Sequence, residues 1–462
     1  MAGIELSDTE VLGALQASMR GEVIGRDAPQ YDDARMLYNA MVDKRPRLIA
    51  RCVDAADVIA AVNFARESGL EIAVRGGSHN GAGSGSVDDG LVIDLTPLRG
   101  VIVDPEARIA RVLGGSLLGD VDHATYPFGL ALPFGFISTT GIGGLTLGGG
   151  VGNLTRTLGL TIDSMIAADV VLADGSFVHA SEDRNDDLFW ALRGGGGNFG
   201  VVTSFTFRLS PMANVLAGPT FWSLDRAGEI LRWYRGFIHE APAQLNGWFA
   251  FVTVPPVPMF PEELHLRKMC AVLWTYAGPQ DQAEEVFAPV RALGPDLDGI
   301  GEVPLPALNS VFDALYPAGD QWYWRADYVR EIPNEAVEAH LDYAQRLPTP
   351  KSTMHLYPLS GAPARLSNED TAWAYRDAGW VQVMVGVDPD PAKADELREW
   401  TVAYWEALHP YSMGGAYVNM MMDEGQERVR ATYRGNYGRL AEIKAKYDPR
   451  NLFHVNQNIR PA

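Results

Sequence analysis

Cysteine is almost absent from this chain, which has only Cys52 and Cys270 among its 462 residues. Two cysteines so far apart are typical of buried thiols in a reducing compartment, not of a disulfide framework or a metal site. No apolar stretch reaches the length of a membrane-spanning helix, and residues 1–13 lack the basic segment and apolar run of an export signal. We therefore predict a cytoplasmic protein with no membrane partner.

Basic residues are also scarce, because 38 Lys and Arg stand against 58 Asp and Glu and give a formal net charge of −20. A chain of this charge repels phosphates, so the composition argues against nucleic acid as a main partner. The histidines show no metal-ligand spacing such as H-E-x-x-H, and we predict no metal site. The chain also lacks G-x-S-x-G and P-loop motifs, which argues against the commonest hydrolases and phosphoryl-transfer enzymes.

The chain is long for one hydrophobic core, and its length predicts two lobes. In the first half, residues 53–69 predict a helix, with Asp54 to cap its start and Gly69 its end. Residues 165–180 predict a hairpin whose tip is Asp174-Gly175, and residues 200–209 alternate like a half-buried strand.

The composition of the sequence changes near residues 210–217, where the glycine clusters largely stop and aromatic residues become frequent. Aromatic strands then alternate with helices predicted over residues 279–292 and 334–346. This order is typical of a sheet that helices cover on one face.

Glycine is concentrated in segments that follow strands or helices of the first half. Such open loops are costly in conformational entropy unless a ligand packs against them, and a dinucleotide would place its pyrophosphate on their N–H groups. The alternative is a set of tight turns between strands, which we favour for Gly114–Gly115 taken alone. The segments are Gly76–Gly85, Gly114–Gly115, Gly141–Gly152 and Gly194–Gly200.

A Rossmann fold is the obvious competing interpretation, because Gly195, Gly197 and Gly200 satisfy G-x-G-x-x-G. That motif requires a strand before it and a helix after it. Here a helical pattern comes before the glycines and a strand pattern after them, so we reject the Rossmann interpretation.

Five motifs in order give the chain a family likeness. Together they resemble the berberine-bridge-enzyme-like FAD-linked oxidases of the vanillyl-alcohol-oxidase superfamily. The motifs are RGGSHN (75–80), TTGIGGLTLGGGVG (139–152), ADVVLADG (168–175), DLFWALRGGGGNFGVV (187–202) and YDPRNLFHVNQNI (447–459).

The resemblance implies an α+β fold with two lobes. A PCMH-type FAD-binding domain would comprise residues 1–212, with residues 425–462 as its C-terminal return. A substrate domain would be inserted between them at residues 213–424, with an antiparallel sheet facing the flavin and helices on the other side.

The resemblance also implies FAD as the cofactor, covalently bound through His79 at the 8-methyl carbon. A neutral imidazole is a competent nucleophile toward that position; the alternative is a histidine hydrogen-bonded within its loop. Many members have a second, cysteinyl link where this chain has Ile137, so we predict a single attachment. Thr140 matches a position that influences oxygen access. The cofactor-binding residues that we predict are His79, Arg75, Gly76, Gly77, Ser78, Asn80, Thr139, Thr140, Gly141, Gly144, Gly149, Gly150, Asn153, Gly200, Val202 and Asn456.

Three side chains are candidates for acid–base catalysis. Tyr417 is the first candidate, because AYVNM (416–420) resembles the family's Y-x-N strand. At the position of Met420, many relatives have a tyrosine or a histidine. His355 and Tyr357 would share one face of a strand, since alternate residues point the same way. A packed tyrosine and a structural histidine are the alternatives. Arg325 would pair with an acidic group of the substrate or with Asp327.

These features predict an FAD-dependent oxidase that takes a hydride from a C–OH or C–N centre of a small molecule and reduces O2 to H2O2. One alternative is an FAD dehydrogenase with another electron acceptor. Another is a flavin-carrying binding protein without turnover. We expect a monomer or a homodimer, and the sequence does not identify the substrate.

Overall fold

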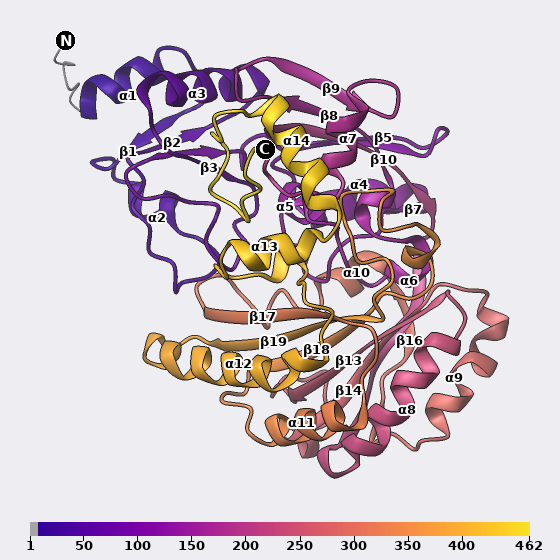
Figure 1. Ribbon diagram of the computed structural model, residues 1–462. Helices are drawn as coiled ribbons and strands as arrows, with labels where there is room; N and C mark the ends of the chain where they lie inside the picture. The colour runs from indigo at the N-terminus through magenta and orange to yellow at the C-terminus, as the bar shows by residue number, and fades with distance from the viewer. Residues whose placement is uncertain (1–7) are drawn as a thin grey trace.

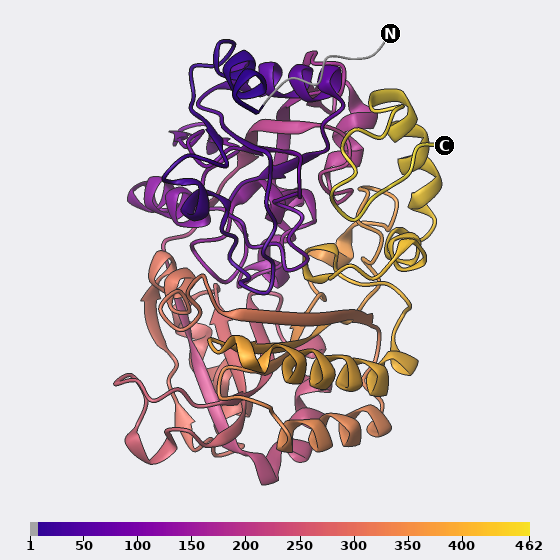
Figure 2. The same cartoon turned by 90° about the vertical axis from the view of Figure 1, so that its left-hand side faces the viewer.

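A computed structural model of the chain describes residues 8–462. Most of residues 1–13, the segment that we interpreted as lacking an export signal, therefore lies outside the described residues. The chain forms two lobes (Figure 1). The first lobe comprises the elements from α1 to β11 together with α13 and α14, and the second comprises β12 to α12. Figure 2 shows the C-terminal segment, in yellow, lying against the first lobe after the chain has passed through the second.

The first lobe contains two main sheets, in the strand orders β1-β2-β4-β3 and β5-β6-β10-β8-β9. Its elements are α1 (Asp8–Gln16), β1 (Val23–Gly25), α2 (Tyr31–Arg35), β2 (Leu48–Arg51), α3 (Ala55–Ser68), β3 (Ile72–Arg75), β4 (Leu91–Asp94), β5 (Val101–Asp104), β6 (Ile109–Leu113), α4 (Leu118–Thr125), β7 (Leu130–Ala131), α5 (Ile142–Leu147), α6 (Thr155–Leu158), β8 (Met165–Val171), β9 (Phe177–Ser181), α7 (Asp186–Leu192), β10 (Val201–Arg208), β11 (Ser210–Pro211), α13 (Gln426–Tyr433) and α14 (Asn436–Tyr447).

The second lobe is built on one sheet in the order β15-β12-β14-β13-β18-β19-β17, with β16 paired to β12. All of its strand pairs are antiparallel. Its elements are β12 (Asn214–Ser223), α8 (Ala227–Glu240), β13 (Leu245–Thr253), β14 (Lys268–Tyr276), α9 (Ala283–Arg291), β15 (Leu297–Asp298), β16 (Gly301–Pro304), α10 (Leu305–Ser310), β17 (Gln321–Val329), α11 (Asn334–Gln345), β18 (Thr353–Pro358), β19 (Trp380–Asp388) and α12 (Ala394–Leu408).

The two faces of this sheet have different partners because strand side chains alternate. Phe249 and Leu356 belong to a core shared with α8, α11 and α12, which lie together on one face of the sheet (Figure 1). Trp248 and Tyr357 belong to the core that the sheet shares with the first lobe. The α+β fold with helices on one side of an antiparallel sheet is therefore confirmed. The domain limits stay predictions, although the chain changes sheet between β11 and β12.

Several local predictions are confirmed by the backbone. The side chain of Asp54 accepts a hydrogen bond from the Asp57 N–H at the start of α3, and Gly69 ends this helix with φ 69°. The hairpin β8–β9 turns at Gly175, whose φ of 84° favours glycine.

Two local predictions are wrong. Strand β10 is not half-buried: all its residues except Thr206 and Arg208 are buried. Both faces of its sheet are covered, since Val202 and Phe205 belong to one core and Val201 belongs to the core that includes α3. The segment after Tyr417 is not a strand but a 3₁₀ turn over Val418–Met420.

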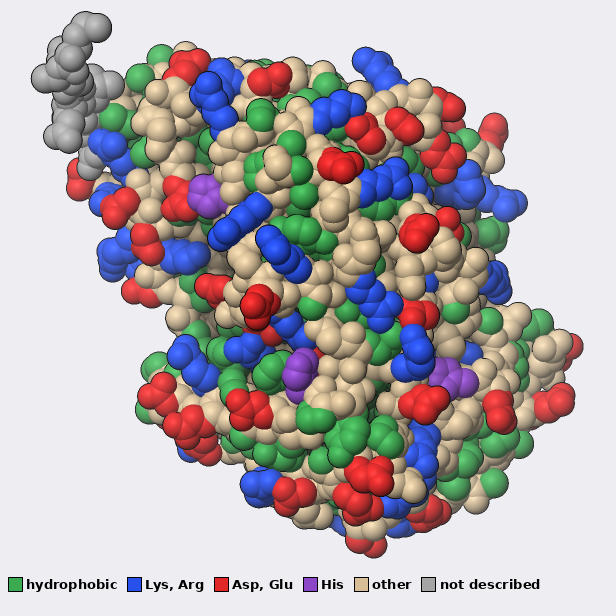
Figure 3. Space-filling view, viewed as in Figure 1, with side chains coloured by type: hydrophobic (Ala, Val, Ile, Leu, Met, Phe, Trp, Pro, Cys, Tyr) green, Lys and Arg blue, Asp and Glu red, His purple; other side chains and the backbone are tan. Residues whose placement is uncertain are grey.

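Cys52 and Cys270 are free and buried. Among residues 8–462, no helix is long and apolar enough to cross a membrane. Acidic and basic side chains are interspersed over the face of the molecule shown in Figure 3.

Candidate active site

A cavity of about 1120 Å³ lies between the two lobes. Its volume exceeds the usual range of small-molecule sites, which is roughly 300–1,000 Å³, so it can hold more than one ligand. All four glycine segments line it, for example through Gly76, Gly114, Gly144 and Gly197. The sheet of the second lobe and the C-terminal segment complete the walls.

The glycines of the first lobe form a cradle that larger residues would fill. A Cβ atom on Gly77 would lie 2.2 Å from the Gly141 nitrogen, so the two loops touch through their backbones. Gly144 and Gly197 have open space where a side chain would project. Beside them, Arg75 donates to Asp94 at 2.9 Å, while its Nε and Nη1 atoms are buried without a hydrogen-bond partner. A bare backbone surface with unused cationic donors fits an anionic, nucleotide-containing ligand.

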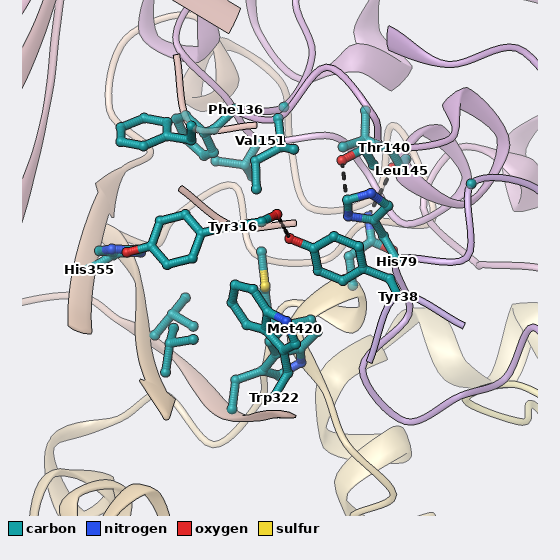
Figure 4. Close-up of a pocket in the computed structure, with 18 of the residues that line it drawn as sticks. Tyr38, His79, Phe136, Thr140, Leu145, Val151, Tyr316, Trp322, His355 and Met420 are labelled. Atoms are coloured by element: carbon teal, nitrogen blue, oxygen red, sulfur yellow. Dashed lines mark hydrogen bonds between the residues drawn. The ribbon is translucent and has the colours of Figure 1, made fainter. Parts of the chain in front are cut away.

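His79 lies in this cradle with its ring stacked on Tyr38, the ring centroids being 3.9 Å apart. Its Nε2 atom lies 3.0 Å from Thr139 Oγ1, and its Nδ1 atom lies 3.5 Å from Thr140 Oγ1 (Figure 4). Burial lowers the pKa of His79 to about 4. The imidazole is therefore neutral near pH 7, the state that a nucleophilic role requires.

Most of the other predicted cofactor residues line the same cavity. They are Arg75, Gly76, Gly77, Ser78, Asn80, Thr140, Gly141, Gly144, Asn153, Gly200, Val202 and Asn456.

Thr139, Gly149 and Gly150 do not line the cavity. The hydroxyl oxygen of Thr139 lies 3.0 Å from His79 Nε2. Gly149 and Gly150 have φ values of 124° and 82°, and a Cβ atom on them would lie 3.0 Å from Trp373 and 2.0 Å from Thr161. A turn that only glycine accommodates accounts for these two residues.

Three residues of strand β18 and one carbonyl of β13 form a hydrogen-bonded chain. Thr353 donates its hydroxyl to the Phe251 carbonyl at 2.7 Å, so its oxygen can only accept from His355 Nε2, which lies 3.0 Å away. The proton of His355 is therefore on Nε2 and its lone pair on Nδ1. Tyr357 then donates its hydroxyl to His355 Nδ1 over 2.6 Å.

His355 lies on the wall opposite His79 (Figure 4), and Tyr357, which is hydrogen-bonded to His355, lines the same cavity. Burial lowers the pKa of His355 to about 3 and raises the pKa of Tyr357 well above its usual range, so both groups are neutral near pH 7. Phe136 stacks on the Tyr357 ring at 4.6 Å, and Trp248 meets the His355 ring edge-on at 4.9 Å. The alternation predicted for this strand is confirmed, and it places both side chains at the cavity.

Tyr417 also reaches the cavity, but its hydroxyl oxygen is already occupied. The oxygen accepts from the Gly150 N–H at 3.0 Å, the Val151 N–H at 3.2 Å and Asn419 Nδ2 at 2.9 Å. Burial raises the pKa of Tyr417, and these three donors oppose that shift. The phenol joins the C-terminal segment to the loop at Gly150.

Of the two partners suggested for Arg325, the pairing with Asp327 is wrong. Arg325 Nη1 lies 2.8 Å from Glu424 Oε2. Asp327 is paired with Arg428 and His409 instead, because residues two apart on β17 point to one face but reach different neighbours.

Sequence reasoning missed two of the aromatic side chains that shape the cavity, Tyr38 and Phe136. Tyr38 comes from a segment without a motif, and Phe136 lies just ahead of the second glycine-rich motif. Trp248 and Trp322 had a signal in the aromatic strand pattern, but the pattern does not distinguish a cavity wall from a packed sheet face.

The fold and this cavity together define a two-lobed flavin-dependent oxidoreductase, and comparisons with known proteins agree. Residues 46–181 match the FAD binding domain family, and residues 416–460 match the berberine and berberine-like family. The (R)-6-hydroxynicotine oxidase of Paenarthrobacter nicotinovorans is 32% identical over 97% of this chain and 98% of its own length. This chain belongs to the berberine-bridge-enzyme-like family of FAD-linked oxidoreductases.

Solved structures show the same fold. The 6-hydroxy-D-nicotine oxidase of Arthrobacter nicotinovorans superposes with a TM-score of 0.86 and 29% identity, covering 96% of this chain and 99% of that one. The glucooligosaccharide oxidase of Acremonium strictum, described with a 6-S-cysteinyl, 8α-N1-histidyl FAD, has a TM-score of 0.85 and 25% identity over 98% and 99% of the two chains.

Proposed function

We propose that the chain is an FAD-dependent oxidase that removes a hydride from a C–OH or C–N centre of a small molecule and reduces O2 to H2O2. One observation carries the proposal: a single cavity places a neutral histidine in a glycine cradle and a hydrogen-bonded Tyr357–His355 pair on the opposite wall. The oxidase names of full-length relatives support the choice of oxygen as acceptor.

His79 would hold the cofactor covalently, and the glycine loops with Arg75 would bind its pyrophosphate. The histidyl FAD of the glucooligosaccharide oxidase supports this role. Ile137 lines the cavity at the position where that family's second link would be made, and an isoleucine side chain cannot form a thioether. We therefore propose a single attachment.

When bound, FAD would accept the hydride and its electron pair from the substrate carbon. The chain must then take the proton from the oxygen or nitrogen attached to that carbon. Tyr357 is the group that we assign to this step: its oxygen receives the substrate proton while its own proton moves to His355 Nδ1. Thr353 fixes the tautomer that leaves Nδ1 free to accept.

Tyr417 is a positioning residue in this proposal. Its oxygen has three donors within 3.2 Å, more than the two lone pairs of a neutral phenol, so it has no free site for a substrate proton. It fixes the loop at Gly150 and Val151, which adjoins the cavity.

The proposed limits of the domains are residues 212/213 and 424/425, where the chain enters and leaves the second lobe. We propose a cytoplasmic enzyme, active as a monomer or a homodimer.

The first test is to denature the purified protein in acid and to ask whether the yellow colour stays with the precipitate. Colour in the pellet, with the FAD mass on a peptide containing His79, supports the tether. Flavin that washes out contradicts it. Substrate-reduced enzyme is then mixed rapidly with oxygen, and slow reoxidation would show a dehydrogenase instead of an oxidase.

A further inference from the structure

The cavity extends well beyond the proposed reaction centre, across the sheet of the second lobe. Strand pairing sets His355 opposite Ala250, Ala250 opposite Ala271, Ala271 opposite Phe221, and Phe221 opposite Leu297. Side chains of directly opposed residues lie on the same face of a sheet. Four strand spacings of roughly 4.8 Å each therefore carry this face about 19 Å from His355 to Leu297. We call the part of the cavity over β13, β14, β12 and β15 the apolar arm.

The lining of the apolar arm is almost entirely hydrocarbon. Its floor includes Leu273, Phe221 and Leu297, and its roof includes Leu308 and Phe312. Among the described residues that line the whole cavity, the only Lys, Arg, Asp or Glu are Arg75 and Lys351, and each is paired with a carboxylate. Neither belongs to the strands of the arm. Hydroxyl groups of ligands would find few partners there.

The loop between β13 and β14 borders the apolar arm. Pro255, Pro256 and Phe260 line the cavity, and Phe260 meets the Phe221 ring edge-on at 5.5 Å. On the same loop, Met259 and Leu266 are 58% and 59% exposed, although both line the cavity. Large apolar side chains exposed at the edge of a cavity mark a surface that receives an apolar ligand.

We infer that the substrate has two parts: a head with the oxidisable C–OH or C–N group at Tyr357, and an alkyl or isoprenoid tail that lies in the apolar arm. This inference rests on the proposed function for the head, but the arm is a property of the cavity itself. Burying apolar surface stabilises the complex, whereas each sugar hydroxyl buried there without a partner is costly. The oligosaccharides that some relatives oxidise therefore do not suit this arm.

The test measures binding to the holoenzyme by calorimetry, without turnover. The probes are 4-methyl-, 4-butyl- and 4-octylbenzamide, with cellotriose as the hydroxyl-rich comparison. We expect the Kd to fall about fourfold for each methylene that the arm buries, and cellotriose not to bind. A Kd that does not change with tail length, or cellotriose that binds more tightly than 4-octylbenzamide, would overturn the inference.

A pair of variants places the tail. Leu273 is half-buried and lines the arm, so the larger side chain of Leu273→Trp fills the arm. Leu293 is also half-buried, but it packs on the helical side of the sheet, away from the cavity, so Leu293→Trp is the matched control. Leu273→Trp should abolish the dependence on tail length and leave the binding of 4-methylbenzamide unchanged. Leu293→Trp should bind the series as the wild type does. An unchanged dependence in folded Leu273→Trp contradicts the inference, and the wild-type series decides it alone if that variant does not fold.

Turnover of 4-alkylbenzyl alcohols separates this inference from the proposed function. Tail-dependent amide binding without reduction of the flavin by any benzyl alcohol supports the arm and contradicts the proposed reaction. Flavin reduction by 4-methylbenzyl alcohol without tail-dependent binding supports the reaction and overturns the arm.

Discussion

Replacing Tyr357 by phenylalanine should slow flavin reduction by about 10²- to 10⁴-fold, the range that a positioned acid–base group contributes. The change removes the hydroxyl that lies 2.6 Å from His355 Nδ1 and keeps the ring that stacks on Phe136. The cavity therefore keeps its shape, and 4-alkylbenzamides should bind with nearly the wild-type Kd.

The same substitution has a cost in stability that the structure also sets. His355 Nδ1 is buried and loses its only donor, while Nε2 keeps its bond to Thr353. An unsatisfied buried acceptor costs about 1–3 kcal/mol of unfolding free energy. This loss is smaller than the typical total stability of about 5–15 kcal/mol, so the variant should fold and carry flavin.

The assay is anaerobic rapid mixing of enzyme with substrate, followed through the visible absorbance of the flavin. Tyr234→Phe is the matched control, because Tyr234 is buried on the helical face of the same sheet and donates to the Gly247 carbonyl at 2.7 Å. The control should lose similar stability and reduce its flavin at the wild-type rate. A Tyr357→Phe enzyme that reduces its flavin as fast as the wild type would refute the relay.

Four further outcomes follow from the site. Flavin reduction should be independent of pH between about pH 5 and 8, because the pKa of His355 is lowered to about 3 and the base stays neutral over that range; a rate that falls as the pH drops through about 6.5 would contradict this. Thermal stability should instead decrease as the pH falls below about 6.5. In the unfolded chain His79 and His355 bind protons below this pH, whereas in the folded chain burial lowers their pKa and keeps them neutral. His79→Ala should release flavin into the acid supernatant while circular dichroism stays native. Tyr417→Phe should lower the melting temperature and the retention of flavin, but slow reduction far less than Tyr357→Phe; the opposite order of rates would make Tyr417 the acid–base residue.

The sequence predicted those parts of the fold that depend on neighbours along the chain. Asp54 and Gly69 mark the ends of α3 because caps act within one helical turn. The glycine segments could be recognised as one site only through their number and their order in the family motifs. The structure adds the reason they meet: Gly77 and Gly141 approach so closely that neither tolerates a side chain.

The parts that could not be predicted depend on contacts between distant segments. The role of Tyr417 changes once Gly150 and Val151, more than 260 positions away, are seen to donate to its oxygen. The burial of β10 depends on what packs against each face of its sheet, α3 included, and alternation along one strand does not show this. The tautomer of His355 depends on the Phe251 carbonyl of another strand.

The charge state of the cavity links the two proposals. Burial keeps both His79 and His355 neutral near pH 7, Arg75 is paired with Asp94, and Lys351 is paired with Asp320. A protonated amine entering this space would lose its hydration without meeting a free carboxylate, which is costly. A neutral alcohol enters without that cost, and its proton passes to Tyr357 and His355 only as the hydride leaves, when the substrate oxygen becomes strongly acidic. The geometry that suits an apolar tail therefore also favours a neutral C–OH head over a cationic amine.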